Sequence, residues 1–107
     1  MKRTYNKLVR DKIPEIIKGN GEKAIIRTLN DNEYWLSLLE KAKEELFEVA
    51  EAETLYETKK ELSDLLEVVR SIAEYKGFSL SEILDEADKK AKERGGFSKR
   101  ILLIGVE

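Results

Sequence analysis

The chain of 107 residues carries 20 Lys and Arg against 22 Asp and Glu, and it contains neither His nor Cys. This length fits one domain, residues 1–107, and the missing residue types exclude disulfides, thiolate nucleophiles, imidazole bases and His- or Cys-based metal sites. Any chemistry must therefore be done by carboxylates, Lys, Arg and hydroxyls. No apolar run is long enough to span a membrane, so we expect a cytoplasmic protein with no membrane partner.

The charge is distributed unevenly along the chain. Residues 1–29 sum to +5, residues 30–88 to −11 and residues 89–107 to +4. A nucleic-acid partner is not expected, because such surfaces need a continuous basic face. The distribution suits a site where carboxylates hold a hard cation and nearby Lys and Arg meet phosphate, although soluble charged helices are the simpler interpretation.

The first predicted helix is short. Asp11 can cap it, Pro14 falls within its first turn, and the sequence Gly-Asn-Gly at 19–21 ends it. The following segment, residues 24–29, is rich in β-branched side chains and predicts a short strand.

Three longer helices follow, each opening with a capping-box pattern. The second begins near Asn30, the third at Thr54 and the fourth at Ser79, each with a Glu three residues later. Apolar residues recur at helical spacing in all three. The apolar run at 101–104 predicts a strand that could pair with residues 24–29. We therefore expect a mainly α protein, a helical bundle of about four helices, with a small two-stranded β element near 24–29 and 101–106 as an added option.

One boundary is poorly marked. Between Ala50 and Glu57 there is neither Gly nor Pro, so the second and third helices could form one long helix. Only Thr54 and its capping pattern favour a break.

The most informative feature is a repeated pair of acids in the middle of the chain. The sequence EELFE at 44–48 is followed, after twelve residues, by ELSD at 61–64. At about 100° per residue, the first acid of each pair, Glu45 or Glu61, lies roughly 70° from the apolar centre of its helix, and the second, Glu48 or Asp64, roughly 130°. In an antiparallel pair of helices both acid pairs could face one cleft or face apart. If they converge, Mg²⁺ is the natural counter-ion, whereas separate acids would simply be solvated.

This pattern, EExxE followed after twelve residues by ExxD, resembles the motif of MazG-like nucleoside triphosphate pyrophosphohydrolases, the all-α NTP pyrophosphatases. The segment YNKLVRDKIPEII at 5–17 also resembles the start of small proteins in that group. The resemblance implies a Mg²⁺-dependent hydrolase, with Mn²⁺ as a substitute ion, that converts nucleoside triphosphates to monophosphate and pyrophosphate. It also implies a homodimer or homotetramer. The implied metal ligands are Glu45, Glu48, Glu61 and Asp64, and Glu44 would hold a further metal or orient the attacking water.

Basic residues are expected to bind the substrate phosphates. The preferred candidates surround the Gly-Gly-Phe sequence at 95–97: Lys92, Arg94, Lys99 and Arg100. The same residues are also typical of an ordinary helix C-terminus. Lys7, Arg10 and Lys12 form a second candidate set.

Other interpretations of the sequence stay open. Trp35 could stack on a nucleobase, but its place on the apolar stripe favours a core position. Phosphoribosyl-ATP is an alternative substrate, because the same metal motif serves its hydrolysis. A non-enzymatic helical interaction module is an alternative of a different class, in which the carboxylates are surface groups and the apolar stripes meet a partner chain.

Overall fold

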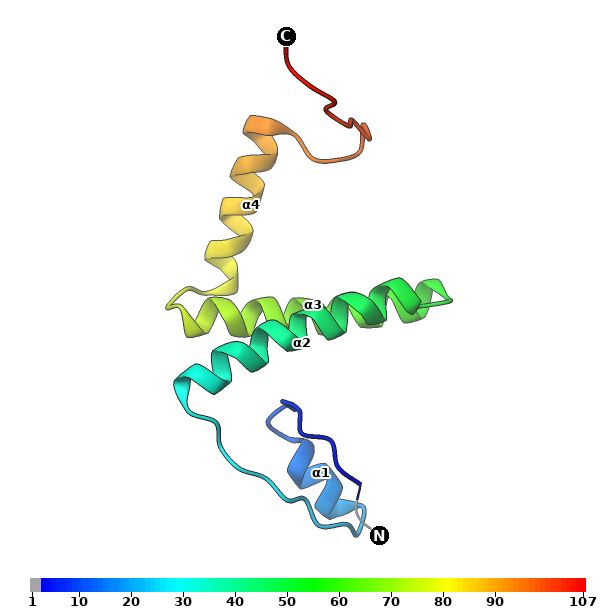
Figure 1. The fold of residues 1–107 in the computed structure, drawn as a ribbon, viewed down its shortest axis with the longest axis vertical. Coiled ribbons are helices and arrows are strands. Elements are labelled where there is room, and N and C mark those ends of the chain that lie inside the picture. Colours follow the sequence, from blue (N-terminus) through cyan, green and yellow to red (C-terminus); the bar gives the residue numbers. More distant parts are fainter. Residues whose placement is uncertain (1–2) are drawn as a thin grey trace.

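Helices provide the regular structure of the molecule (Figure 1). The structure, a computed structural model, describes residues 3–107. It contains four helices: α1 (Ile13–Gly19), α2 (Asp31–Glu51), α3 (Leu55–Tyr75) and α4 (Leu80–Arg94). The mainly α class is confirmed. None of the helices in this described range combines the length and the apolar character needed to cross a bilayer.

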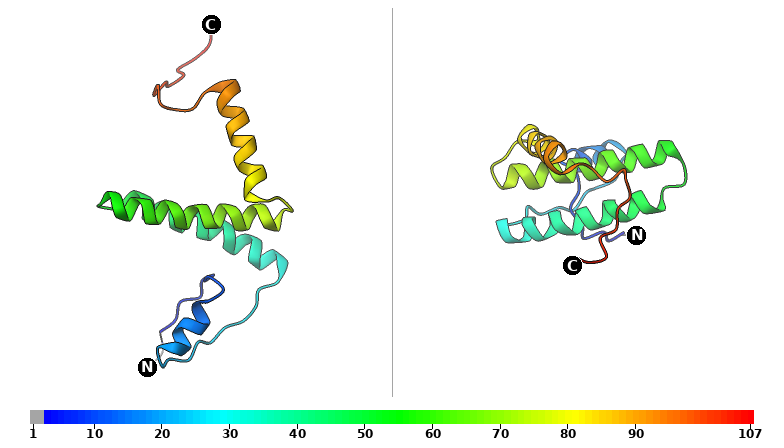
Figure 2. Two further views of the ribbon diagram at one scale, coloured as in Figure 1. Left: turned by 180° about the vertical axis from the view of Figure 1, so that it is seen from behind. Right: turned by 90° about the horizontal axis from the view of Figure 1, so that it is seen from above.

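Helices α2 and α3 form an antiparallel hairpin, which all the views show side by side (Figures 1 and 2). Each helix alternates apolar and charged side chains at helical spacing, so one face of each can be buried against the other. The buried apolar side chains, Leu38 on α2 and Val68 and Ala73 on α3, belong to this hairpin. The hairpin is therefore the core of the chain.

Helices α2 and α3 are separate helices, with a break at residues 52–54. In the sequence, only Thr54 and its capping pattern favoured this break. Ala52 adopts an extended conformation, with φ −62° and ψ 130°, which ends α2. The Thr54 hydroxyl then accepts a hydrogen bond from the backbone N–H of Glu57 and begins α3. The predicted capping box is only half formed, because the Glu57 carboxylate accepts from the N–H of Glu53 rather than from that of Thr54. The complete boxes predicted at Asn30 and Ser79 are both present.

The short helix α1 begins differently from the prediction. Lys12 occupies the N-cap position and no side chain caps the helix, so Asp11 does not have the role expected of it. Pro14 lies in the first turn as predicted. Because Pro fixes φ and needs no N–H partner there, it favours this start without a side-chain cap.

The optional β element is not formed within residues 3–107. Residues 24–29 and 101–106 are both extended chain without strand pairing. Figure 1 shows the reason, because the two segments lie on opposite sides of the α2–α3 hairpin. Extended, β-branched sequence makes a strand only when another strand is within hydrogen-bonding reach.

Helix α4 leaves the hairpin at a steep angle and carries the C-terminal segment away from it (Figures 1 and 2). The turn depends on Gly77, whose φ of +91° is a left-handed conformation that glycine adopts readily. The N–H of Phe78 also returns to the carbonyl of Ala73, which closes the end of α3. The result is an elongated chain, 62 × 35 × 25 Å in extent.

Candidate metal centre

The two helices of the hairpin bring three of the predicted metal ligands together. Glu45 on α2 and Glu61 and Asp64 on α3 each offer a carboxylate oxygen, and these three oxygens lie within 4.8 Å of one another. One acid of α2 and both acids of the α3 pair therefore converge across the hairpin. The antiparallel pairing brings Glu45 opposite one turn of α3, since Glu61 and Asp64 are three residues apart on that helix.

Glu45 is the buried member of this acid cluster, which we define as Glu45, Glu61 and Asp64. Only 8% of its surface is exposed. Burial is the main cause that raises the pKa of its carboxyl, and the nearby carboxylates of Asp64, Glu44 and Glu61 raise it further. The ammonium of Lys41, 3.7 Å from a Glu45 carboxylate oxygen, acts in the opposite sense. A cation bound here would relieve this repulsion.

The other two predicted acids, Glu44 and Glu48, lie outside the cluster. Glu44 occupies the edge of the site, where its carboxylate pairs with Lys41 at 3.4 Å and with Lys7 at 3.6 Å. Glu48, one turn beyond Glu45 on α2, is exposed to solvent. Its predicted role as a ligand would require its side chain to turn toward the cluster.

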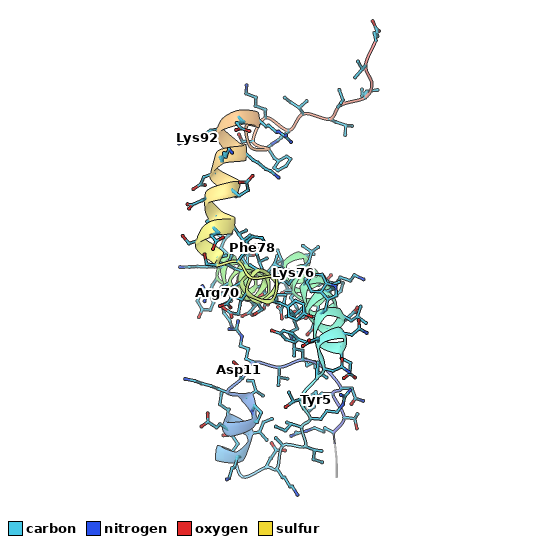
Figure 3. All side chains as sticks on the ribbon, turned by 90° about the vertical axis from the view of Figure 1, so that its left-hand side faces the viewer. Tyr5, Asp11, Arg70, Lys76, Phe78 and Lys92 are labelled. Atoms are coloured by element: carbon cyan, nitrogen blue, oxygen red, sulfur yellow. The ribbon has the colours of Figure 1, made fainter. Side chains whose placement is uncertain are left out.

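The N-terminal segment contributes cations to the same place. Arg10 Nη2 lies 2.8 Å from Asp64 Oδ1, and Lys7 contacts Glu44. Figure 1 shows this part of the chain passing beneath the hairpin, and Figure 3 labels Asp11 there. Two members of the second candidate set, Lys7 and Arg10, thus contact acids at this site, whereas the third, Lys12, makes no ion pair with them.

The preferred phosphate-binding candidates lie elsewhere. Lys92 and Arg94 belong to the last turn of α4, and Figure 3 shows Lys92 at the end of that helix away from the hairpin. Lys99 and Arg100 follow in the exposed C-terminal segment. Arg94 borders a shallow hollow with Lys90 and Phe97, which contains no part of the acid cluster. Within one chain, therefore, none of these four basic residues lies at the acid cluster.

Lys41 belongs to the site but to none of the predicted motifs. Its ammonium contacts both Glu44 and Glu45, so it is the internal counter-charge of the site. The signal was available in the spacing, because Lys41 stands three and four residues before these two acids on the same helix.

Trp35 is engaged within the protein rather than open to a ligand. Its ring stacks on Tyr75, with centroids 5.6 Å apart, and the Lys76 ammonium lies 4.2 Å from its centroid. Tyr34 packs edge-on against the same Tyr75. These contacts tie the start of α2 to the end of α3 and favour a structural role for Trp35, although its side chain is half-buried rather than part of the core.

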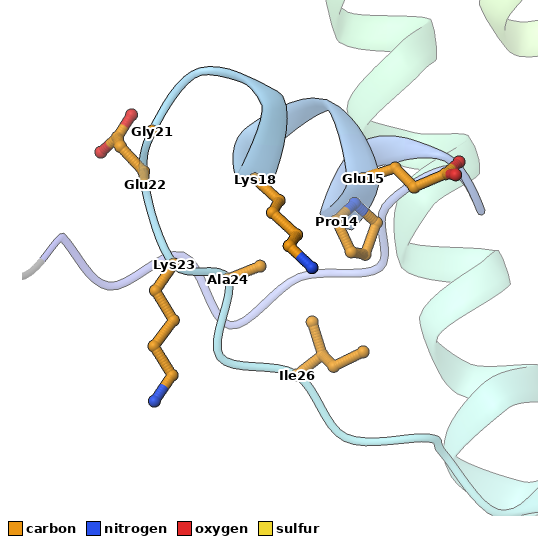
Figure 4. Close-up of a pocket in the computed structure, with 8 residues that line it drawn as sticks. All are labelled: Pro14, Glu15, Lys18, Gly21, Glu22, Lys23, Ala24 and Ile26. Carbon is orange, nitrogen blue, oxygen red and sulfur yellow. The ribbon is translucent and has the colours of Figure 1, made fainter.

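The molecule also has a hollow that lies apart from the acid cluster. It measures about 670 Å³ and lies between α1 and the segment that follows it, with Pro14, Lys18 and Ile26 among its lining residues (Figure 4). Its two acids and two lysines do not converge on one point in Figure 4, where Lys23 and Glu22 point away from the hollow. The acid cluster is the stronger candidate because its charged groups do converge.

The donor set of the acid cluster fits Mg²⁺. All three donors are carboxylate oxygens, the ligand type that this ion prefers, and Mg²⁺ binds through a few carboxylates while keeping several waters. At bond lengths of about 2.1 Å, octahedral ligand oxygens lie roughly 3 Å apart when adjacent and roughly 4.2 Å apart when opposite. A spacing of 4.8 Å or less therefore needs at most a small side-chain adjustment.

Comparison with known proteins gives no functional name. No protein-family model matches the chain, and no solved structure matches it. An uncharacterized protein of Mycolicibacterium smegmatis is 51% identical over 47 residues, which cover 44% of this chain and 48% of that protein. The match thus spans about half the length of that relative.

Proposed function

We propose that the protein is a Mg²⁺-dependent nucleoside triphosphate pyrophosphohydrolase. The observation that carries this proposal is the convergence of Glu45, Glu61 and Asp64 from two antiparallel helices. The proposal is further supported by the sequence at 44–64, which resembles the metal-binding motif of MazG-like enzymes. A chain without His or Cys can carry out this reaction, because phosphoryl transfer depends mainly on positioning and on electrostatic stabilisation.

In the proposed reaction a water oxygen attacks the α-phosphorus and the bond from that phosphorus to the bridging oxygen breaks. The products are a nucleoside monophosphate and pyrophosphate, and the proton of the water passes to solvent through a nearby base. Bound Mg²⁺ would polarise the phosphoryl oxygens and lower the pKa of a bound water. The acid cluster, with Glu48, would hold the ion, and Glu44 at the edge of the site would orient the water.

The direct test is a product assay. Purified protein is incubated with common and modified NTPs and with phosphoribosyl-ATP, and pyrophosphate release is followed with and without Mg²⁺. We expect Mg²⁺-dependent pyrophosphate release that falls at least about a hundredfold in Asp64→Asn, since that change removes a ligand charge. Glu40→Gln, an exposed acid on α2, is the matched control and should keep full activity.

The same assay separates the alternatives. Turnover of phosphoribosyl-ATP alone would identify the alternative substrate. Absence of turnover with every nucleotide, together with absence of Mg²⁺ binding, would favour the helical interaction module.

We further propose that the chain assembles as a homodimer or homotetramer. Its accessible surface is 9998 Å², whereas a compact monomer of this mass exposes about 6,100 Å². Its radius of gyration is 18.1 Å, against about 13 Å for a compact chain of this length. The excess of about 3,900 Å² per chain exceeds what one obligate interface needs, since such interfaces bury about 2,000–5,000 Å² in total over both partners. A second copy, which carries the same apolar surface, would cover it.

A further inference from the structure

The segment at residues 5–12, which we call the basic segment, contains Lys7, Arg10 and Lys12, the second candidate set for phosphate binding. It carries three cations and one acid, and two of the cations reach the proposed site. Lys7 contacts Glu44 on α2 and Arg10 contacts Asp64 on α3, so the segment bridges both helices of the hairpin. Its partners are 37 and 54 residues away in sequence, so these contacts are tertiary ones that the fold brings about.

The charges at the site suggest what these cations do. Together the acid cluster and Glu44 carry four negative charges, and Lys7, Arg10 and Lys41 carry three positive ones. The balance is −1, and one bound Mg²⁺ would change it to +1. Asp64, once engaged by the ion, would no longer need Arg10, and Lys7 beside it would face a site of net positive charge, so both cations would attract an anion.

The two cations are suited to move in this way. Both side chains are about half exposed, and each makes its contact at the solvent-facing edge of the site rather than in the core. Exposed pairs of this kind contribute little to stability, so exchanging one anionic partner for another costs little free energy. The guanidinium of Arg10 can also bind a phosphate through two parallel hydrogen bonds.

We propose that the basic segment is the phosphate-binding element of the site, in which Arg10 and Lys7 pass from the carboxylates to the substrate triphosphate once the metal binds. This inference rests on the proposed function. It assigns to these two residues the role that the sequence favoured for Lys92, Arg94, Lys99 and Arg100. Arg10 and Lys7 are then binding residues, and Arg10 is also a competitor of the metal for Asp64.

The two parts of this proposal predict effects of opposite sign. In Arg10→Gln, Mg²⁺ alone should bind as tightly as in the wild type or more tightly, because its competitor is gone. Inorganic tripolyphosphate, added with Mg²⁺, should bind about tenfold more weakly, because a charged hydrogen-bond donor is lost. Arg10→Lys should restore part of this binding. Both affinities are measured by calorimetry, so no turnover is needed.

Arg70→Gln is the matched control, since Arg70 is an exposed arginine on α3 that pairs with Glu67 of the same helix. It should bind tripolyphosphate as the wild type does. Lys7→Gln provides a second variant should Arg10→Gln fail to fold, and it should also weaken tripolyphosphate binding. The inference is overturned if wild-type protein with Mg²⁺ does not bind tripolyphosphate, or if the folded Arg10 or Lys7 variant binds it unchanged. Nucleotide hydrolysis by wild-type protein would leave the proposed function standing in either case.

Discussion

Glu45 has an environment unlike that of an ordinary helical glutamate. It is nearly buried, it has two carboxylates from α3 within 4.8 Å, and its counter-charge is a lysine of its own helix at 3.7 Å. Burial and the neighbouring acids raise its pKa. Ionisation of Glu45 therefore destabilises the folded, metal-free protein. A bound cation would remove this destabilisation.

Glu45→Gln should separate stability from metal binding. Without Mg²⁺ the variant should melt a few degrees higher than the wild type, since about 1 kcal/mol shifts Tm by roughly 4–8 °C in a domain of this size. With Mg²⁺ the wild type should gain stability and the variant should not. Thermal denaturation at pH 7, with and without Mg²⁺, measures both effects. A variant less stable than the wild type in the absence of metal would show that Glu45 is a structural residue.

The raised pKa of Glu45 also sets a pH dependence. As pH rises through that pKa, the group ionises and the metal-free protein loses the stability that the protonated carboxyl allowed. The affinity for Mg²⁺ changes in the opposite direction, because the ligand must be ionised. Titration of Mg²⁺ binding against pH should show affinity declining, on acidification, at a higher pH than an unperturbed Glu would give. A midpoint at the ordinary value for Glu would contradict this assignment.

At the scale of single elements, the hairpin depends on how α2 begins and how it ends. The sequence correctly predicted the capping boxes at Asn30 and Ser79, because a box is a local pattern that needs no tertiary information. It could not decide between one long helix and two, since residues 50–57 have no strong breaker. The break at Ala52 is favoured by packing of α3 against α2, which is tertiary. Whether the acids of the two helices face one cleft also depends on this packing, so the sequence could not determine it.

The start of α2 should be sensitive to acid. The Glu33 carboxylate accepts two hydrogen bonds from Arg27 and one from the backbone of Asn30, which lower its pKa from 4.5 to about 2. Because the folded-state pKa is lowered, its stabilising effect is present above about pH 4.5 and is lost as pH falls toward 2. Urea denaturation of Glu33→Gln and wild type should differ most at neutral pH and converge near pH 2. An equal difference at both pH values would disprove the ionic contribution.

At the scale of the whole molecule, the chain exposes more apolar surface than a stable monomer does. The C-terminal residues are the extreme case, with Ile104 95% exposed and Leu102 84% exposed. The sequence predicted residues 101–104 as a strand because they are an apolar run, and the same apolar character now marks them as surface that needs a partner. The sequence could not show which surface covers this segment. Its predicted strand partner, residues 24–29, lies on the far side of the hairpin.

Self-association should therefore depend on this segment. Leu102→Asp with Ile104→Asp should shift the protein toward smaller species, because each change places a charge in an interface that excludes water. Sedimentation velocity at several concentrations measures the distribution. Lys99→Asp, in the same exposed segment but not apolar, is the control for added acidic charge. A wild-type chain that sediments as a monomer at all concentrations would contradict the proposed assembly.

The proposed function depends most on the acid cluster being a metal site, and calorimetric titration with MgCl₂ tests this most directly. The wild type and the Glu40→Gln control should bind Mg²⁺ saturably, with equal affinity. Asp64→Asn should bind at least about tenfold more weakly, because it replaces a charged ligand by a neutral one. If wild-type protein gives no binding heat up to roughly 10 mM Mg²⁺, well above the range of ordinary protein sites for hard cations, the three carboxylates are only neighbours on a folded hairpin and the proposed hydrolase is wrong.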